Sequence, residues 1–346
     1  MDVKIKKLPK AEIEIEGEIP FSDLEVHRGK ALKKLGADLS LPGFRKGHVP
    51  LNIIAEKVGE INLLNEMAEM ALGIAYPKII IDNKIDPIAH PQITVTKIAT
   101  GNPLGFTIKV PVMPILDLPD YKKIAKEAVS KKEEVKIEEG DVQKVIDQVL
   151  DSKKGDDGKR PELTDELVKT LGDFTDLKDF NEKVRDGVQK EKEWREKEKV
   201  RLQIMEAIVR ETKGELPEII IEGELDKMIA GFKGDIERMG LKVDEYLKNN
   251  NKTVEELRVE WRSEAEKRGK SQLIINKIAI EEKIYPKAED VEKEAKHLME
   301  HHKEADLNRV RVYVETILTN EGVMGWLENG VDERKEKPIE SPNKKE

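Results

Sequence analysis

The stretch LPGFRKGHVP at residues 41–50 contains side chains that are well suited to binding a large anionic partner. Arg45 and Lys46 are cations next to an aromatic ring, Phe44, within a segment punctuated by glycine and proline. Such cations bind phosphate oxygens, and the ring can enter an apolar niche or stack on a base. The glycines and prolines restrict the tip, so less entropy is lost on docking. The pattern predicts an exposed docking loop, with an ordinary helix-to-helix connection as the alternative.

Signals for other chemistry are weak. The chain has no cysteine, which excludes disulfides, thiolate catalysis and Cys-ligated zinc. GKS at 269–271 resembles the end of a phosphate-binding loop, but Glu264 stands where the first glycine belongs. His297, His301 and His302 have a helical spacing that could hold a metal, yet they lie among charged residues, which favours a solvated face. We therefore expect no catalytic residues, no metal and no cofactor.

Length and charge narrow the function classes. The 346 residues are enough for two or three domains, and 38% of them are charged whereas only 4% are aromatic, so long helices with solvated faces are expected. The net charge of −9 argues against coating nucleic acid over the whole surface and leaves room only for a local basic patch. The sequence shows no signal-peptide core and no apolar run near the roughly 20 residues of a membrane span, which predicts a cytoplasmic protein without membrane contact.

Residues 1–115 combine two periodicities. AEIEIEGEI, QITVTKI and GFTIKVPV alternate with period two, as half-buried strands do. FSDLEVHRGKALKKLGADL and LNIIAEKVGEINLLNEMAEMALGIAYPKIIID carry helical spacing between them. Strands that return after helices predict an α+β N-terminal domain with an antiparallel sheet. The 41–50 stretch falls between the two helical segments.

The remainder reads as a linker followed by an all-α part. Residues 116–160 are expected to form an extended linker that enters a weak helix, then a short amphipathic helix at 138–150 and a polar hinge at 151–160. We predict an elongated helical domain with arms over 161–328 and a disordered tail over 329–346.

Several helix limits in this part follow from local signals. Residues 176–211 can form one helix about 50 Å long, whose charged middle around Trp194 should face solvent or contact another segment loosely. Pro217 is suited to begin a helix. Thr253 and Glu256 form a predicted capping box for a second long helix that ends near residue 284. Shorter helices are expected at 288–303 and 307–328.

The loop and its flanks resemble the trigger factor family of ribosome-associated bacterial chaperones. The motif G-F-R-K-G-x-V-P, which is that family's ribosome-docking signature, is intact here at Gly43, Phe44, Arg45, Lys46, Gly47, Val49 and Pro50. LNIIAEKVG follows as the family's next helix, KIDPIAHPQITV as its return to the sheet, and PELTDELVKTLG (161–172) is similar to the opening of its C-terminal domain. The resemblance covers nearly all of residues 1–328.

The resemblance implies an ATP-independent chaperone that docks at the nascent-chain exit of the large ribosomal subunit. Residues 43–47 would contact ribosomal protein and rRNA phosphates, and helical arms would shield unfolded nascent polypeptides. Self-association of the free protein is left open. Candidate client-binding side chains, each with an ordinary core position as an equal alternative, are Met205, Met228, Ile229, Phe232, Met239, Met299 and Met324.

The sequence departs from the family in one respect. Family members usually carry a prolyl isomerase domain of the FKBP type, which needs about a hundred residues and an apolar, aromatic-lined pocket. Residues 122–171 contain no Phe, Tyr or Trp, so we expect that domain to be absent and the protein not to be an enzyme. Two alternatives remain: a prolyl isomerase like full-length members, and a ribosome-independent chaperone of the periplasmic SurA type, whose helical domain the C-terminal part also resembles.

Overall fold

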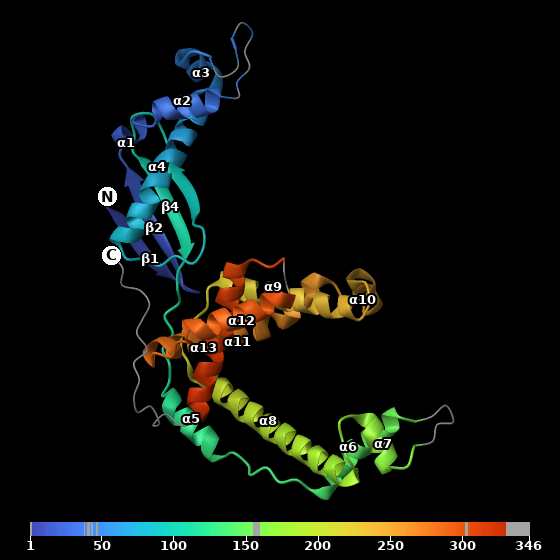
Figure 1. Ribbon diagram of the computed structural model, residues 1–346. Coiled ribbons are helices and arrows are strands. Elements are labelled where there is room, and N and C mark those ends of the chain that lie inside the picture. Colours follow the sequence, from blue (N-terminus) through green and yellow to red (C-terminus); the bar gives the residue numbers. More distant parts are fainter. Residues whose placement is uncertain are drawn as a thin grey trace. The chain divides into compact units, whose positions relative to one another are not determined.

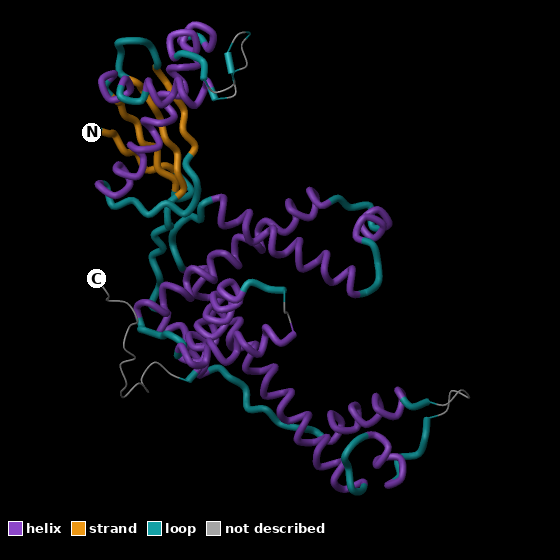
Figure 2. Tube along the Cα trace, turned by 45° about the horizontal axis from the view of Figure 1, so that its top comes forward, coloured by secondary structure: helices purple, strands orange, loops and turns teal. Residues whose placement is uncertain are grey.

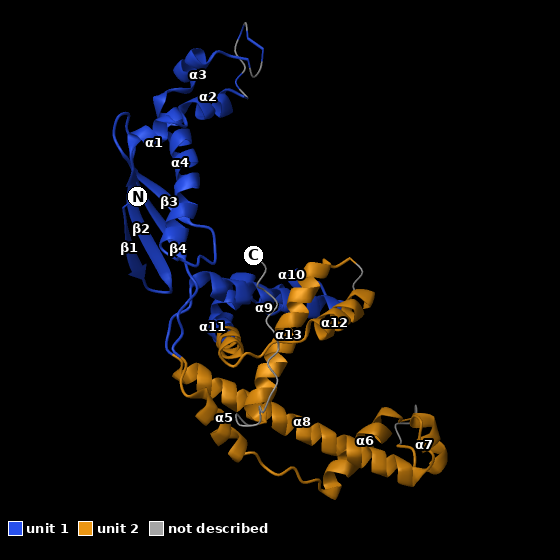
Figure 3. Ribbon diagram, turned by 60° about the vertical axis from the view of Figure 1, so that its left-hand side comes forward, with its two compact units in different colours: residues 1–117, 213–270 blue, residues 118–212, 271–346 orange. Residues whose placement is uncertain are grey.

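The protein divides into two compact units in a computed structural model (Figure 1). One unit comprises residues 1–117 and 213–270, and the other comprises 118–212 and 271–346 (Figure 3). The domain boundaries predicted at residues 115, 160 and 328 divide the chain into consecutive segments, whereas each unit combines two segments that are distant in sequence. The units therefore do not test those boundaries, which stay predictions. The structure describes residues 2–37, 39, 42, 44, 45, 48–154, 160–301 and 304–329. Most of the predicted C-terminal tail, and residues 155–159 of the predicted hinge, lie outside them.

The first unit contains a four-stranded antiparallel sheet (Figure 2), which confirms the predicted α+β class. Its strands, in the spatial order β1-β2-β4-β3, are β1 (Val3–Leu8), β2 (Glu12–Ile19), β4 (Leu104–Pro111) and β3 (Gln92–Lys97). Ile15 of β2 pairs with Ile5 and with Ile108, so one apolar row crosses the sheet. The sequence prediction did not include β1, where three lysines dilute the alternating apolar signal of VKIKKL.

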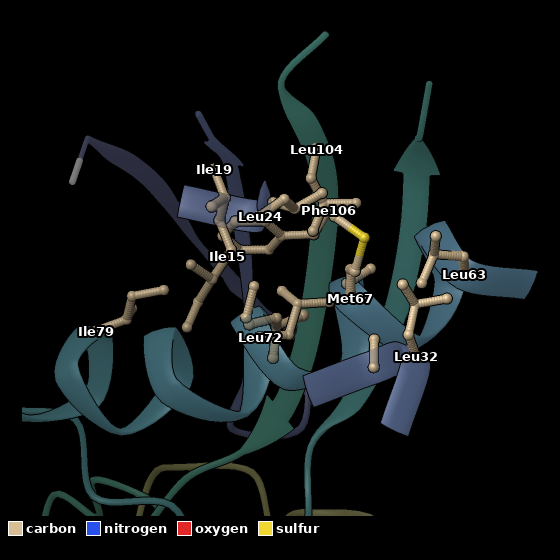
Figure 4. Packing of buried hydrophobic residues seen from close by; sticks show 14 of the residues in the cluster. Ile15, Ile19, Leu24, Leu32, Leu63, Met67, Leu72, Ile79, Leu104 and Phe106 are labelled. Atoms are coloured by element: carbon tan, nitrogen blue, oxygen red, sulfur yellow. The ribbon is translucent and has the colours of Figure 1, made fainter. Parts of the chain in front are cut away.

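Helix α4 covers one face of this sheet, and its side chains Met67, Leu72 and Ile79 lie toward Ile15 and Phe106 (Figure 4). The helices of this region are α1 (Phe21–Glu25), α2 (Arg28–Gly36), α3 (Leu51–Val58) and α4 (Glu60–Asp82). Both predicted helical stretches are therefore divided.

Gly59 explains the second division. Its φ of 80° and ψ of 153° end α3 and begin α4 in a new direction, a backbone conformation that glycine adopts at little cost. Helices α2 and α3 pack on each other, and α2 also packs on α4.

The same unit contains α9 (Glu218–Arg238), α10 (Val243–Asn249) and the first turns of α11 (Val254–Glu281). Pro217 caps the start of α9 as predicted. The predicted capping box is confirmed: the Thr253 N–H donates to the Glu256 carboxylate at 2.8 Å, and the Glu256 N–H donates to Thr253 Oγ1 at 3.2 Å. An aromatic group joins α9 to α10 and α11, because Phe232 meets Tyr246 and Trp261 edge to face.

All the regular secondary structure among the described residues of the second unit is helical. It contains α5 (Tyr121–Ser130), α6 (Glu139–Ser152), α7 (Asp165–Leu171), α8 (Leu177–Glu211), the end of α11, α12 (Ala288–His301) and α13 (Leu307–Glu328). The predicted helices at 138–150, 176–211 and 307–328 are present, and the helix predicted at 288–303 is present as far as His301, where the described residues pause. Val142, Ile146, Val168 and Phe180 form the small core between α6, α7 and α8.

The charged middle of α8 behaves as predicted. Trp194 is 62% exposed, and an extended segment before α6 contacts the helix mainly through polar groups: Lys192 Nζ donates to the Lys136 carbonyl at 3.2 Å, and Lys199 pairs with Glu133 at 3.5 Å. Across the part of the chain that the structure describes, no helix combines the length and the apolar character that a membrane span requires.

Candidate functional site

The segment between α2 and α3 is fixed at both ends by the core of the first unit. The Leu39 N–H donates to the Gly36 carbonyl at 3.2 Å as the chain leaves α2, and the Leu39 side chain packs against the core cluster. At the other end Val49 is buried in that cluster and Pro50 caps α3. Both ends of the segment are therefore held by packing against the core of the first unit.

The tip carries exposed side chains of the kind predicted. Phe44 is 40% exposed and Arg45 is exposed, and the His48 N–H donates to the Arg45 carbonyl at 3.0 Å. Gly43, Lys46 and Gly47 lie outside the described residues. An aromatic ring beside a guanidinium, both open to solvent on an anchored loop, can combine an apolar contact with a phosphate contact.

The candidate client-binding residues differ in exposure. Met239 is 71% exposed where α9 ends, whereas Met205, Met228, Phe232 and Met299 are half-buried. Ile229 and Met324 are buried, so a client could reach them only after a local movement. The assignment of all seven residues to client binding stays a prediction.

Other exposed apolar side chains were not singled out from the sequence. In the first unit Ile115 is 78% exposed and Val259 77%, and in the second unit Ile280, Val312 and Tyr313 are at least 60% exposed. Sequence periodicity would have missed them, since each lies in a helix or segment that also carries buried apolar residues. Only packing separates the two sets.

The histidine group does not form a metal site in the described part of the chain. The rings of His297 and His301 are 5.5 Å apart and perpendicular, and His302 lies outside the described residues. Among the described residues, no three side chains of His, Cys, Asp or Glu come together as metal ligands would.

Comparison with known proteins decides the family. A family profile described as "Bacterial trigger factor protein (TF)" matches residues 1–149, and one described as "Bacterial trigger factor protein (TF) C-terminus" matches residues 176–329. The chain belongs to the trigger factor family. This family of chaperones was the one that the loop motif indicated, and the two matched segments contain both the 41–50 stretch and the long helices.

Curated trigger factors are similar to this family member over most of its length. The trigger factor of Clostridium kluyveri (strain NBRC 12016) is 23% identical over 423 aligned positions, which cover 94% of this chain and 98% of the relative. That of Clostridium botulinum (strain Hall / ATCC 3502 / NCTC 13319 / Type A) is 24% identical over 422 positions, with the same coverage. Since each alignment is longer than the 346 residues of this chain, the relatives contain residues that have no counterpart here.

A solved structure confirms that the fold is that of a trigger factor. It comes from work named "Promiscuous Substrate Recognition in Folding and Assembly Activities of the Trigger Factor Chaperone". The similarity has a TM-score of 0.57 at 18% identity and covers 94% of this trigger factor family member and 99% of that chain.

Proposed function

We propose that this trigger factor family member docks at the nascent-chain exit of the large ribosomal subunit and shields newly made polypeptides there without using ATP. The observation that carries the proposal is the pair Phe44 and Arg45, which are exposed on a loop whose ends are fixed in the core. The guanidinium matches rRNA phosphates, and the ring fits an apolar or base-stacking niche on the same surface. A cytoplasmic location belongs to the same proposal, because ribosomes are there.

The helical parts of both units supply the surface for clients in this proposal. Exposed apolar side chains such as Met239, Val259 and Tyr313 are distributed over several helices. An unfolded chain presents many short apolar segments, so several weak contacts can hold it at once. Methionine suits such binding because its flexible side chain adapts to different partners.

The proposal includes no isomerase activity. Between Leu118 and Arg160 the described residues form α5, α6 and irregular segments, with no strand among them, and residues 122–171 contain no aromatic side chain to line a proline pocket. The longer alignments with the curated relatives support the same interpretation.

A loop variant tests the docking. Replacement of Phe44, Arg45 and Lys46 together by alanine should nearly abolish co-sedimentation with large ribosomal subunits, because the aromatic contact and both phosphate contacts are lost. The same variant should still suppress aggregation of a denatured client, with or without ATP, because the helical surfaces are unchanged. Far-ultraviolet circular dichroism should show the helical content of the parent.

A matched control removes the same kinds of side chain elsewhere. Tyr313, Arg309 and Lys296 are exposed on α13 and α12, and their joint replacement by alanine also deletes one aromatic ring and two cations. This variant should pellet with ribosomes like the parent. If the loop variant pellets as well as the parent does, the docking assignment is wrong. If only the control fails to pellet, the docking surface lies in the helical part instead.

A further inference from the structure

Helix α2, which leads directly into the docking loop, turns a basic face to solvent. At 100° per residue, Ala31, Leu32 and Gly36 fall on one side of the helix, and all three are buried. The opposite side carries Lys30, Lys33 and Lys34, all exposed. The helix contains no acidic residue, so its solvent face has a single sign of charge.

One of these three lysines is engaged within the fold. Lys34 Nζ lies 2.6 Å from the carboxylate of Glu66, which is only 9% exposed, and 3.8 Å from that of Glu69, both on α4. Lys34 thus neutralises a nearly buried carboxylate. Among the described residues, no ion pair involves Lys30 or Lys33. These two cations remain available to a partner.

The surroundings of the two lysines favour a polyanion. Residues 26–50 contain six cations, Arg28, Lys30, Lys33, Lys34, Arg45 and Lys46, and one carboxylate, Asp38, in a chain whose net charge is −9. Small residues lie next to these lysines: Gly29 is exposed at the edge of the face, with no atom from outside its own stretch of helix within 4 Å of the position that a Cβ would take, and Ala37 is exposed. A phosphate backbone could therefore approach the helix closely without a steric barrier.

We propose that Lys30 and Lys33 form a second phosphate-binding contact, which extends the docking loop along α2 and binds the rRNA backbone. This proposal rests on the proposed ribosome docking and adds residues outside the loop motif to it. The two ammonium groups act as point charges that position the domain on the RNA without reading its sequence. Their contribution should depend strongly on salt, because each phosphate contact releases condensed counterions.

The test compares the salt dependence of ribosome binding for the parent and for the double variant Lys30→Gln/Lys33→Gln. For each protein, the logarithm of the binding constant for large subunits is plotted against the logarithm of the KCl concentration. A phosphate contact contributes about 0.7 to 0.9 to the steepness of this plot, so the double variant should be shallower by about 1.4 to 1.8. Equivalently, the ratio of the parent's binding constant to that of the double variant should fall about 25-fold or more when the KCl concentration rises tenfold.

A matched control has the same change of charge at a distance from the loop. Lys233 on α9 and Lys248 in the last turn of α10 are exposed, and Lys233→Gln/Lys248→Gln should leave the plot of the parent unchanged. Lys248 also controls for the favourable effect of a cation at a helix C-terminus, which applies to Lys33 on α2. If the Lys30/Lys33 variant loses helix stability but keeps the slope of the parent, the lysines serve the helix only and the proposal is overturned.

The remaining outcomes separate this proposal from the one on which it rests. If the parent itself does not bind ribosomes, the docking function fails together with the further inference. If the parent binds and the double variant binds with an equal slope, only the inference about α2 fails. Vesicles of phosphatidylglycerol serve as a second polyanion. A loss of binding confined to the vesicles would assign the basic face to lipid and overturn the rRNA contact.

Discussion

Replacement of Arg201 by alanine should loosen the packing of α13 on α8 in the second unit. The Arg201 side chain is only 13% exposed and donates to both carboxylate oxygens of Glu321, at 2.9 and 2.6 Å. It also donates to both carboxylate oxygens of Glu328, which is 11% exposed. Among the described residues, Glu328 forms ion pairs with Arg201 and with Lys197. After the change it would keep only the weaker one, with Lys197 at 3.6 Å.

The expected size follows from these contacts. Breaking a fully buried ion pair costs about 3 to 5 kcal/mol because one charge is left without a partner. Glu321 is 59% exposed and Glu328 keeps a cation nearby, so we expect a smaller loss of about 2 to 3 kcal/mol in the free energy of opening α13. Since 1.36 kcal/mol corresponds to a factor of ten, amide hydrogens of α13 should exchange about 30 to 150 times faster.

Hydrogen exchange of α13 peptides, followed by mass spectrometry on the full chain, measures this directly. Arg195→Ala on the same helix is the matched control, because Arg195 is 71% exposed and pairs with Glu191 four residues away. Such a pair contributes about 0.3 to 0.5 kcal/mol, so the control should change exchange by roughly twofold at most. If Arg201→Ala changes α13 exchange no more than Arg195→Ala does, the reasoning that the contacts of Arg201 with Glu321 and Glu328 hold α13 on α8 is refuted.

Three further predictions concern pH, a glycine and catalysis. Hydrogen bonds from Arg201 hold the pKa of Glu321 below its ordinary value of 4.5. The stability that Glu321 contributes is therefore present above pH 4.5 and is lost as the pH falls through the lower folded-state pKa. In acid unfolding the parent should lose more stability than Glu321→Gln over that pH interval, and equal losses would contradict the assignment. Gly231→Ala in α9 introduces a Cβ with no atom within 4 Å and should stabilise the helix by up to about 1 kcal/mol, seen as slower exchange of α9 amides; faster exchange would show that the glycine is needed. Added protein should not change the cis-to-trans rate of a proline tetrapeptide, whereas a rate proportional to protein concentration would reveal an isomerase.

Local signals in the sequence were sufficient for the longer helices of the C-terminal part and for the exposure of Phe44 and Arg45. Pro217 and the pair Thr253 and Glu256 mark helix starts through backbone geometry and capping that depend on residues a few positions apart. The loop motif likewise depends on neighbouring residues, and Phe44 and Arg45 are exposed as it predicts. Gly59, which divides a predicted helix, was also a local signal, and it was missed because the apolar spacing continues across it.

Only the tertiary structure decided which side chains are available to partners. Met239 and Met324 are equivalent candidates in sequence, yet one is exposed and the other is buried, because burial depends on segments far away along the chain. The same holds for charge: three lysines look alike on α2, and it is the approach of α4, with Glu66 more than thirty residues later, that occupies Lys34. A sequence determines which residues can bury surface or carry charge, and only the packing of distant segments determines which of them are left free to bind.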